Sequence, residues 1–151
     1  MSGPNLICRK GEGENLNILG TTLRFLCHAE DTKRAWSVME NVLPENAGPP
    51  LHHHSWDECY FVTAGEVEFQ IGDRRERVRE GDFVYTPGGV VHAFRGLSKT
   101  PAKLVIFDAP AFTEAYFKEI DREVKELPRD FEKVPGIAAR NGLHIIGPAV
   151  W

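Results

Sequence analysis

The chain has 151 residues, 42% hydrophobic and 26% charged, which is typical of a soluble globular domain long enough to bury a core. Its formal net charge of -4 is opposite to that of proteins that grip phosphate backbones, so we expect no nucleic-acid partner. No stretch approaches the roughly twenty apolar residues of a membrane span, and no secretory signal is visible at the start, so we expect no membrane association.

Short apolar runs separated by turn residues fill the chain from residue 6 to about 109. The run Glu66–Ile71 alternates apolar with polar residues, the period of a strand with one solvated face. A Gly-Asp pair then predicts a tight turn into Arg74–Arg79, and the mixed charges around it indicate a solvated hairpin. The other predicted strands are Thr21–Cys27, Trp36–Leu43, Glu58–Thr63, Asp82–Tyr85, Val91–Phe94 and Lys103–Asp108.

The pattern changes near residue 110, where apolar residues recur at four-residue spacing and predict a helix over Ala111–Leu127. Its apolar stripe consists of Phe112, Tyr116, Ile120 and Val124, and its polar side of Glu114, Asp121, Arg122 and Lys125. Pro128 is expected to stop this helix. A shorter helix is predicted over Pro135–Arg140, and a last strand over Leu143–Ile146.

Many short strands with regularly spaced turns favour a sandwich or a closed barrel. Residues 1–110 would form this barrel, and residues 111–151 a helical extension that packs on the barrel or on a partner subunit. The extension is too short for a core of its own, so we expect one domain overall.

The most informative residues are His52 and His54, which lie two apart in the segment Gly48–Glu58. In an extended strand such residues point to the same side, with Cα atoms roughly 6.6 Å apart. Their imidazole nitrogens can therefore converge on one ion at about 2.0–2.1 Å. His53 points away. The spacing predicts that His52 and His54 are metal ligands.

Glu58 follows at a further even offset and could join this pair, although a bend at residues 55–57 would break the parity. His92 follows a Pro-Gly-Gly turn that would return it beside the first group. The alternative for a lone histidine is a surface or hydrogen-bonded core role. Three consecutive histidines could also form a solvated cluster that binds metal only incidentally.

Together these residues resemble the two sequence motifs of the cupin superfamily. The first motif is matched in order and spacing by His52, His54, Glu58 and Gly65, and the second by Gly81, Pro87, Gly89 and His92. Two positions depart from the motifs: Asn46 replaces an opening glycine and Gly96 a closing asparagine. Asparagine tolerates left-handed backbone, and position 96 lies outside the metal set. The resemblance covers roughly residues 6–110.

The resemblance implies an all-β fold, the cupin double-stranded β-helix or jelly-roll barrel, with a short C-terminal helical extension. It also implies that His52, His54, Glu58 and His92 hold one divalent transition metal. Three imidazoles and a carboxylate suit Fe, Mn, Ni, Co, Cu or Zn, and the residues do not choose among them. Structural zinc sites are normally closed by four protein ligands. A barrel of this size needs no metal for its stability, so a reactive site with an open coordination position is favoured.

Strand parity also predicts a substrate pocket. Tyr60 and Val62 share the parity of Glu58, and Phe94 shares that of His92, so these side chains would face the same interior. They would suit a flat or moderately hydrophobic small molecule. The alternative is that they belong only to the barrel core.

The run Gly-Pro-Pro-x-His-x-His, the Val-His-Ala-Phe segment and the C-terminal helix resemble bacterial single-domain cupins similar to quercetin 2,3-dioxygenase. The resemblance implies a dioxygenase acting on an enolisable or flavonol-like aromatic, with Glu58 as the catalytic base. Two alternatives stay open: a non-redox cyclase or isomerase of a polyketide or keto compound, and a non-catalytic module that binds a small molecule or a metal. Cupins commonly pair, so a homodimer is expected.

The three cysteines are Cys8, Cys27 and Cys59, an odd and widely spaced set without a Cys-x-x-Cys motif. This usage is typical of reduced thiols and predicts a cytoplasmic location. Other chemistry finds little support, since neither a complete dinucleotide-binding motif nor a Gly-x-Ser-x-Gly motif occurs.

Overall fold

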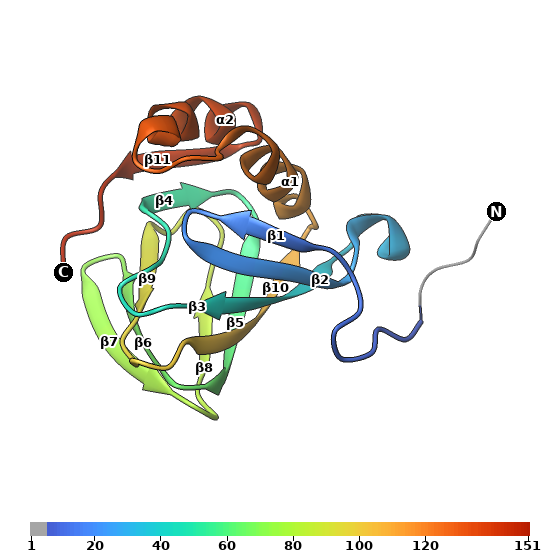
Figure 1. The fold of residues 1–151 in the computed structure, drawn as a ribbon, viewed down its shortest axis with the longest axis horizontal. Helices are drawn as coiled ribbons and strands as arrows, with labels where there is room; N and C mark the ends of the chain where they lie inside the picture. Colours follow the sequence, from blue (N-terminus) through green and yellow to red (C-terminus); the bar gives the residue numbers. More distant parts are fainter. Residues whose placement is uncertain (1–5) are drawn as a thin grey trace.

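Two antiparallel sheets face each other and enclose the core in the computed structural model, which describes residues 6–151 (Figure 1). The first sheet contains, in spatial order, β1 (Asn15–Ile18), β2 (Thr21–Cys27), β3 (Ser37–Leu43), β10 (Ala102–Ala109), β5 (Asp57–Ala64) and β8 (Phe83–Thr86). The second contains β11 (Leu143–Gly147), β4 (Leu51–His54), β9 (His92–Gly96), β6 (Glu66–Ile71) and β7 (Arg74–Arg79). This arrangement is a jelly-roll barrel, as predicted.

Alternation along the strands determines which side chains fill the barrel. In β3 every second residue is buried, and the same period of two runs through β10 and the first part of β5. The inward residues include Met39, Leu43, Val62 and Leu104, none of which is exposed to solvent. Hydrophobic burial on this scale is the main force that holds the two sheets together.

The charged hairpin of β6 and β7 is confirmed. Glu66 pairs with Arg79 at one end of the ladder and Ile71 with Arg74 at the other. All of β7 is exposed except Val78, which is half-buried. Because β7 is the edge of the second sheet, its charged side chains also discourage pairing with another strand.

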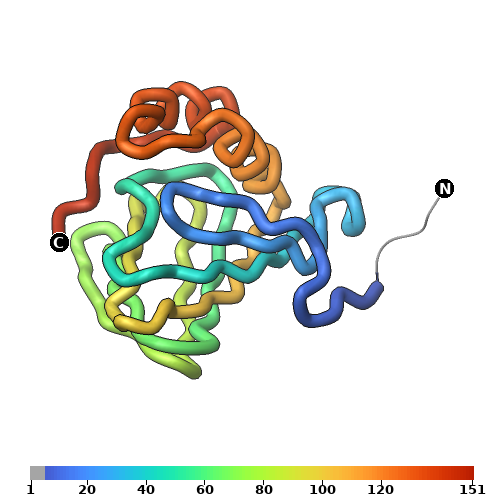
Figure 2. Tube along the Cα trace, in the orientation of Figure 1, coloured from blue at the N-terminus to red at the C-terminus, as the bar shows by residue number. Residues whose placement is uncertain are grey.

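The C-terminal segment covers one end of the barrel with α1 (Thr113–Glu123), the 3-10 helix η2 (Arg129–Lys133) and α2 (Val134–Arg140) (Figures 1 and 2). It then returns as β11, which pairs with β4 so that Leu143 lies opposite His54 and Ile145 opposite His52. The last strand therefore lies directly against the strand that bears two of the histidines. Among residues 6–151, no helix has the length and apolarity that a bilayer crossing requires.

The predicted helix over Ala111–Leu127 is too long. Helix α1 ends at Glu123, and the next residue, Val124, is extended and buried. The carboxylate of Asp130 accepts hydrogen bonds from the amides of Lys125 and Glu126, at 2.9 and 3.0 Å. These bonds satisfy the backbone without a helix, so the chain leaves α1 before Pro128 is reached.

Glu114, on the predicted polar side of this helix, is not exposed to solvent. Glu114 is buried, with 9% of its surface exposed. Its carboxylate accepts a hydrogen bond from the Ala29 amide at 3.0 Å and contacts His28 Nδ1 at 3.0 Å. The short 3-10 helix η1 (Ala29–Thr32) covers that side of α1, a contact between distant parts of the chain that helical periodicity does not reveal.

Candidate metal centre

A glycine turn positions His92 beside the first group of histidines. The Gly89 amide donates a hydrogen bond to the His54 carbonyl at 2.7 Å, and the Gly88 amide donates one to Asp57 Oδ1 at 2.8 Å. A Cβ atom at position 88 would lie only 2.2 Å from the Ser55 carbonyl oxygen, so no side chain fits there. The turn therefore packs directly on the segment after β4, and β9 begins with His92 paired to His52.

The two positions that depart from the cupin motifs are explained by close backbone contacts. Asn46 has a φ of 64°, the left-handed conformation that asparagine tolerates, and its amide donates a hydrogen bond to the Gly96 carbonyl at 2.8 Å. At Gly96, a Cβ atom would lie 2.4 Å from the Pro44 carbonyl oxygen. The segment before β4 thus packs so tightly on β9 that position 96 has no room for a larger residue.

Three imidazole rings converge at the end of this arrangement. One nitrogen from each of His52, His54 and His92 lies within 4.8 Å of the others, and all three residues are buried. His53 points to the other side of β4, where its ring lies 5.0 Å from that of His144. The structure thus brings the three histidines together and leaves His53 outside the group.

Backbone carbonyls orient all three rings in the same way. His52 Nδ1 lies 2.8 Å from the Pro50 carbonyl, His92 Nδ1 lies 2.8 Å from the Val90 carbonyl, and His54 Nδ1 lies 2.9 Å from the Trp56 carbonyl. A carbonyl only accepts, so each Nδ1 must carry the proton and donate it. In a neutral imidazole, Nε2 then presents a free lone pair, the form that binds a metal.

The free nitrogens fit a divalent metal. Nε2 of His54 and Nε2 of His92 are buried and make no hydrogen bond with any of the described residues, an arrangement that is costly unless a ligand completes it. Burial lowers the pKa of His52 to about 3, and His92 beside it adds to the shift, so the ring is neutral at neutral pH. Neutral imidazoles on a common centre suit Fe, Mn, Co, Ni, Cu or Zn.

Glu58 lies against two of the three histidines. Its Oε1 is 3.4 Å from His54 Nε2, and its Oε2 is 3.7 Å from His92 Nε2. The hydroxyl of Tyr60 donates a hydrogen bond to Oε2, and the indole of Trp56 donates one to Oε1 at 3.4 Å. Glu58 is therefore held beside the three-histidine group, and its role as a fourth ligand stays a prediction.

The protonation states around Glu58 follow from burial and neighbouring groups. Burial raises the pKa of Glu58, but the interactions with His54 and His92 in their protonated form outweigh this effect, and the pKa then lies well below its usual range. Burial, and then the charge of Glu58, raise the pKa of Tyr60 well above its usual range. Tyr60 thus keeps its proton and remains a hydrogen-bond donor to the carboxylate.

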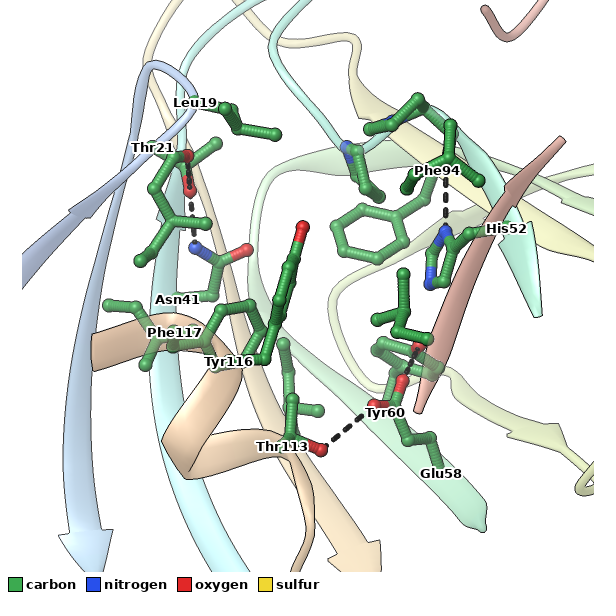
Figure 3. Close-up of a pocket in the computed structure, with 17 residues that line it drawn as sticks. Leu19, Thr21, Asn41, His52, Glu58, Tyr60, Phe94, Thr113, Tyr116 and Phe117 are labelled. Carbon is green, nitrogen blue, oxygen red and sulfur yellow. Dashed lines mark hydrogen bonds between the residues drawn. The ribbon is translucent and has the colours of Figure 1, made fainter. Parts of the chain in front are cut away.

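A largely apolar cavity opens onto this centre from the barrel end near α1 and β11 (Figure 3). His52 and Glu58 line it, together with Tyr60 and Phe94 of the predicted substrate pocket. Val62, also predicted there, is fully buried and is not among the lining residues. The cavity has a volume of about 50 Å³, which is room for several waters.

Sequence reasoning did not identify four polar residues of the cavity wall, Thr21, Asn41, Thr113 and Tyr116. Tyr116 belongs to the predicted apolar stripe of α1, which was assigned only to packing. Asn41 carried a signal, because it occupies an inward position of β3 between Met39 and Leu43. A polar residue at a core position of a strand requires a partner or a ligand.

Comparisons with known proteins find a family and several relatives to which part of this chain is similar. The family described as Cupin domain matches residues 39–108. Dimethylsulfoniopropionate lyase DddQ of Ruegeria pomeroyi is 33% identical over 94 residues, a match that covers 56% of this chain and 45% of the lyase. Quercetin 2,3-dioxygenase of Bacillus subtilis is 22% identical over 115 residues, which covers 76% of this chain and 34% of that enzyme.

This chain therefore matches less than half the length of either named enzyme. Among solved structures, an RmlC-like cupin from Shewanella frigidimarina superposes with a TM-score of 0.64 at 18% identity, covering 74% of this chain and 96% of that one. This likeness concerns the fold. The Cupin domain match includes both histidine-bearing segments, and the two-sheet barrel is shared with a solved cupin. Residues 39–108 are therefore similar in sequence to the Cupin domain family, and the barrel has the fold of that solved cupin.

Proposed function

We propose that this protein is a metal-dependent dioxygenase that acts on a small enolisable or flavonol-like aromatic molecule. One observation carries the proposal: the cavity ends on His52 and Glu58, so a molecule in the cavity reaches one metal-binding imidazole and one carboxylate together. His54 and His92 complete the nitrogen set and are not among the residues that line the cavity. This arrangement suits a reactive site better than a closed structural one.

The residues have distinct roles in this proposal. His52, His54, His92 and Glu58 would hold a divalent transition metal, which supplies a Lewis acid that polarises an enol or phenol oxygen. Glu58 would accept the proton of that hydroxyl group. The Tyr60 hydroxyl and the Trp56 indole fix the carboxylate in position, and the indole also stacks on His54 with ring centroids 4.2 Å apart.

The apolar walls favour an aromatic substrate. Phe94 lines the cavity beside Tyr60, with ring centroids 5.3 Å apart, and most other lining side chains are aliphatic or aromatic. Such walls suit a flat apolar body with a few polar groups. The similarity to a quercetin 2,3-dioxygenase agrees with this chemistry.

The first experiment measures the metal in protein purified without added salts, and then dioxygen uptake with flavonols and other enolisable aromatics. The proposal expects dioxygen consumption in step with loss of substrate, and no turnover under strict anaerobiosis. Glu58→Gln should lower turnover about 10²–10⁴-fold while three imidazoles still retain metal. Glu66→Gln makes the same change at an exposed position of β6 and should leave turnover unchanged.

The other outcomes point to different functions. Turnover without dioxygen would replace the proposal with a non-redox reaction, such as cyclisation or isomerisation of a polyketide or keto compound, in which Glu58 again serves as the base. No turnover with any of the six metals would favour a module that binds a small molecule or a metal.

A further inference from the structure

Two polar side chains lie in the cavity wall across from His52. Asn41 belongs to β3 and Tyr116 to α1, and they are 3% and 4% exposed. Figure 3 shows the side-chain oxygen of Asn41 pointing into the cavity on the side of Tyr116. Neither residue takes part in the reaction proposed above, so their presence in an apolar wall needs a separate explanation.

Hydrogen bonds determine which end of the Asn41 amide faces the cavity. Asn41 Nδ2 lies 3.1 Å from Thr21 Oγ1 and 3.0 Å from the Thr22 carbonyl. Thr21 Oγ1 donates its own proton to the Ile18 carbonyl at 2.8 Å, so it can only accept from Asn41. Thr21 Oγ1 and the Thr22 carbonyl are therefore both acceptors, so the atom of Asn41 that faces them must be the donor Nδ2. The remaining atom, Oδ1, is an acceptor without a hydrogen bond from any described residue.

The Tyr116 hydroxyl makes no hydrogen bond with any residue in the described part of the chain, although the side chain is nearly buried. Burial raises the pKa of Tyr116, so the hydroxyl keeps its proton at every ordinary pH. Because Tyr116 lines the cavity and its hydroxyl has no partner among these residues, a ligand in the cavity can supply the missing hydrogen bond. The cavity therefore offers a fixed acceptor and an unused hydroxyl donor near one end.

We propose that Asn41 and Tyr116 recognise an uncharged hydroxyl group on the substrate, at the end remote from the metal. That hydroxyl would donate to Asn41 Oδ1 and accept from the Tyr116 hydroxyl, because one group can do both. Among the described lining residues, Glu58 at the metal end is the one whose side chain is charged at neutral pH. A carboxylate or an ammonium group would therefore remain unpaired at the remote end.

This inference rests on the proposed function, and its test uses pairs of probes that differ by one hydroxyl. Kojic acid and allomaltol share an enol beside a ketone, but kojic acid carries a hydroxymethyl group where allomaltol carries a methyl group. Flavonol and 4′-hydroxyflavonol make a longer pair with the same difference. Binding of each probe to the zinc-loaded protein is measured by calorimetry, so no turnover is required.

In at least one pair, the hydroxylated probe should bind about tenfold more tightly than its partner. Tyr116→Phe, which removes only the hydroxyl, and Asn41→Leu should each reduce this ratio to about one to twofold. Tyr85→Phe removes a hydroxyl from the exposed side of β8 and should leave the ratio unchanged. Zinc content and thermal melting verify that each variant is folded.

Equal affinities within both pairs would overturn the inference and leave the enol-binding function standing. A ratio that survives both Tyr116→Phe and Asn41→Leu would also overturn it, because another group would then select the hydroxyl. If none of the four probes binds the zinc-loaded protein, the proposed function fails, and the inference that rests on it fails with it.

Discussion

Each of the three histidines donates from Nδ1 to a carbonyl two residues away, before it in His52 and His92 and after it in His54. These short-range bonds orient the rings before any ion arrives. A metal therefore spends little free energy on ordering the rings, and each ring contributes fully to its binding. Replacing any one ring by alanine should reduce metal affinity at least tenfold. Metal analysis and titration of His52→Ala, His54→Ala and His92→Ala measure this loss.

His53→Ala is the matched control, since His53 is adjacent in sequence and points to the opposite side of β4. It should leave metal content unchanged. Equal losses in all four variants would mean that the histidines act as an unspecific cluster rather than as an oriented site.

At the level of single residues, the sequence predicted which histidines of the site converge. Two-residue spacing in a strand determines that His52 and His54 share a face, so their convergence follows from local geometry alone. The donors to Glu58 did not follow in the same way. Tyr60 was recognised as a neighbour of Glu58, but its hydrogen bond depends on side-chain rotamers. The Thr113 hydroxyl donates a hydrogen bond to Glu58 Oε1 at 3.4 Å, and this contact depends on how α1 packs.

Gly48 gives a second prediction for a single residue. A Cβ atom there would lie 1.8 Å from the Phe94 carbonyl oxygen, so Gly48→Ala must push the segment before β4 away from β9. We expect a loss of unfolding free energy of about 2–4 kcal/mol, measured by denaturant titration.

Gly147→Ala is the corresponding control. A Cβ atom at Gly147 meets nothing within 4 Å, so this variant should be as stable as the parent or slightly more so. A Gly48→Ala protein of parental stability would contradict the tight packing described at this point.

Among the elements, strands were easier to predict than the helix. Alternating burial is local, and the predicted strands agree with β2, β3, β5, β6, β7, β8, β9 and β10 to within about two residues. Strand β1 was not predicted and is only four residues long, as is β4, which was expected as an extended run around His52 and His54. The predicted helix was too long because the side-chain carboxylate that accepts from the backbone after α1 belongs to Asp130, which lies beyond the apolar stripe.

The contact between η1 and α1 depends on Glu114, and this gives a prediction with a pH dependence. Burial raises the pKa of Glu114, but Lys118, the Ala29 amide and His28 outweigh it, so the pKa falls below its ordinary value of 4.5. The unfolded chain therefore takes up the proton first as pH falls below about 4.5, and the stability that the carboxylate contributes is lost in acid.

Glu114→Gln removes this charge and should lower the unfolding free energy near pH 7 by about 1–2 kcal/mol. It should also flatten the decline of stability below about pH 4.5, relative to the parent. Glu132→Gln, an exposed change in η2, is the control. Denaturant titrations at several pH values measure both effects, and parallel curves for parent and Glu114→Gln would contradict the assignment.

For the molecule as a whole, the sequence predicted the fold through the resemblance of two motifs rather than through strand pairing. Local patterns do not reveal that β10 lies between β3 and β5, or that β11 returns to lie beside β4. These pairings join residues far apart in the chain, and burial selects them only after the whole barrel closes. The expected homodimer stays a prediction, which light scattering in solution would test.

The weakest connection in the second sheet lies at the metal centre. Strands β4 and β9 share one residue pair, His52 with His92, whereas β6 and β9 share five. A metal held by His52, His54, His92 and Glu58 would tie β4, β9 and β5 together at this point. Bound metal should therefore stabilise the whole barrel and not only the site.

Free metal at a hundredfold excess over its Kd adds about 2.7 kcal/mol to the unfolding free energy, if the unfolded chain does not bind it. For a domain of this size, that gain raises Tm by roughly 5–10 °C. Calorimetry of metal-loaded and chelator-treated protein measures the shift. His92→Ala should melt at nearly the same temperature with and without metal, because its centre is incomplete. If chelator treatment leaves the Tm of the parent protein unchanged, these strands are not joined through a metal.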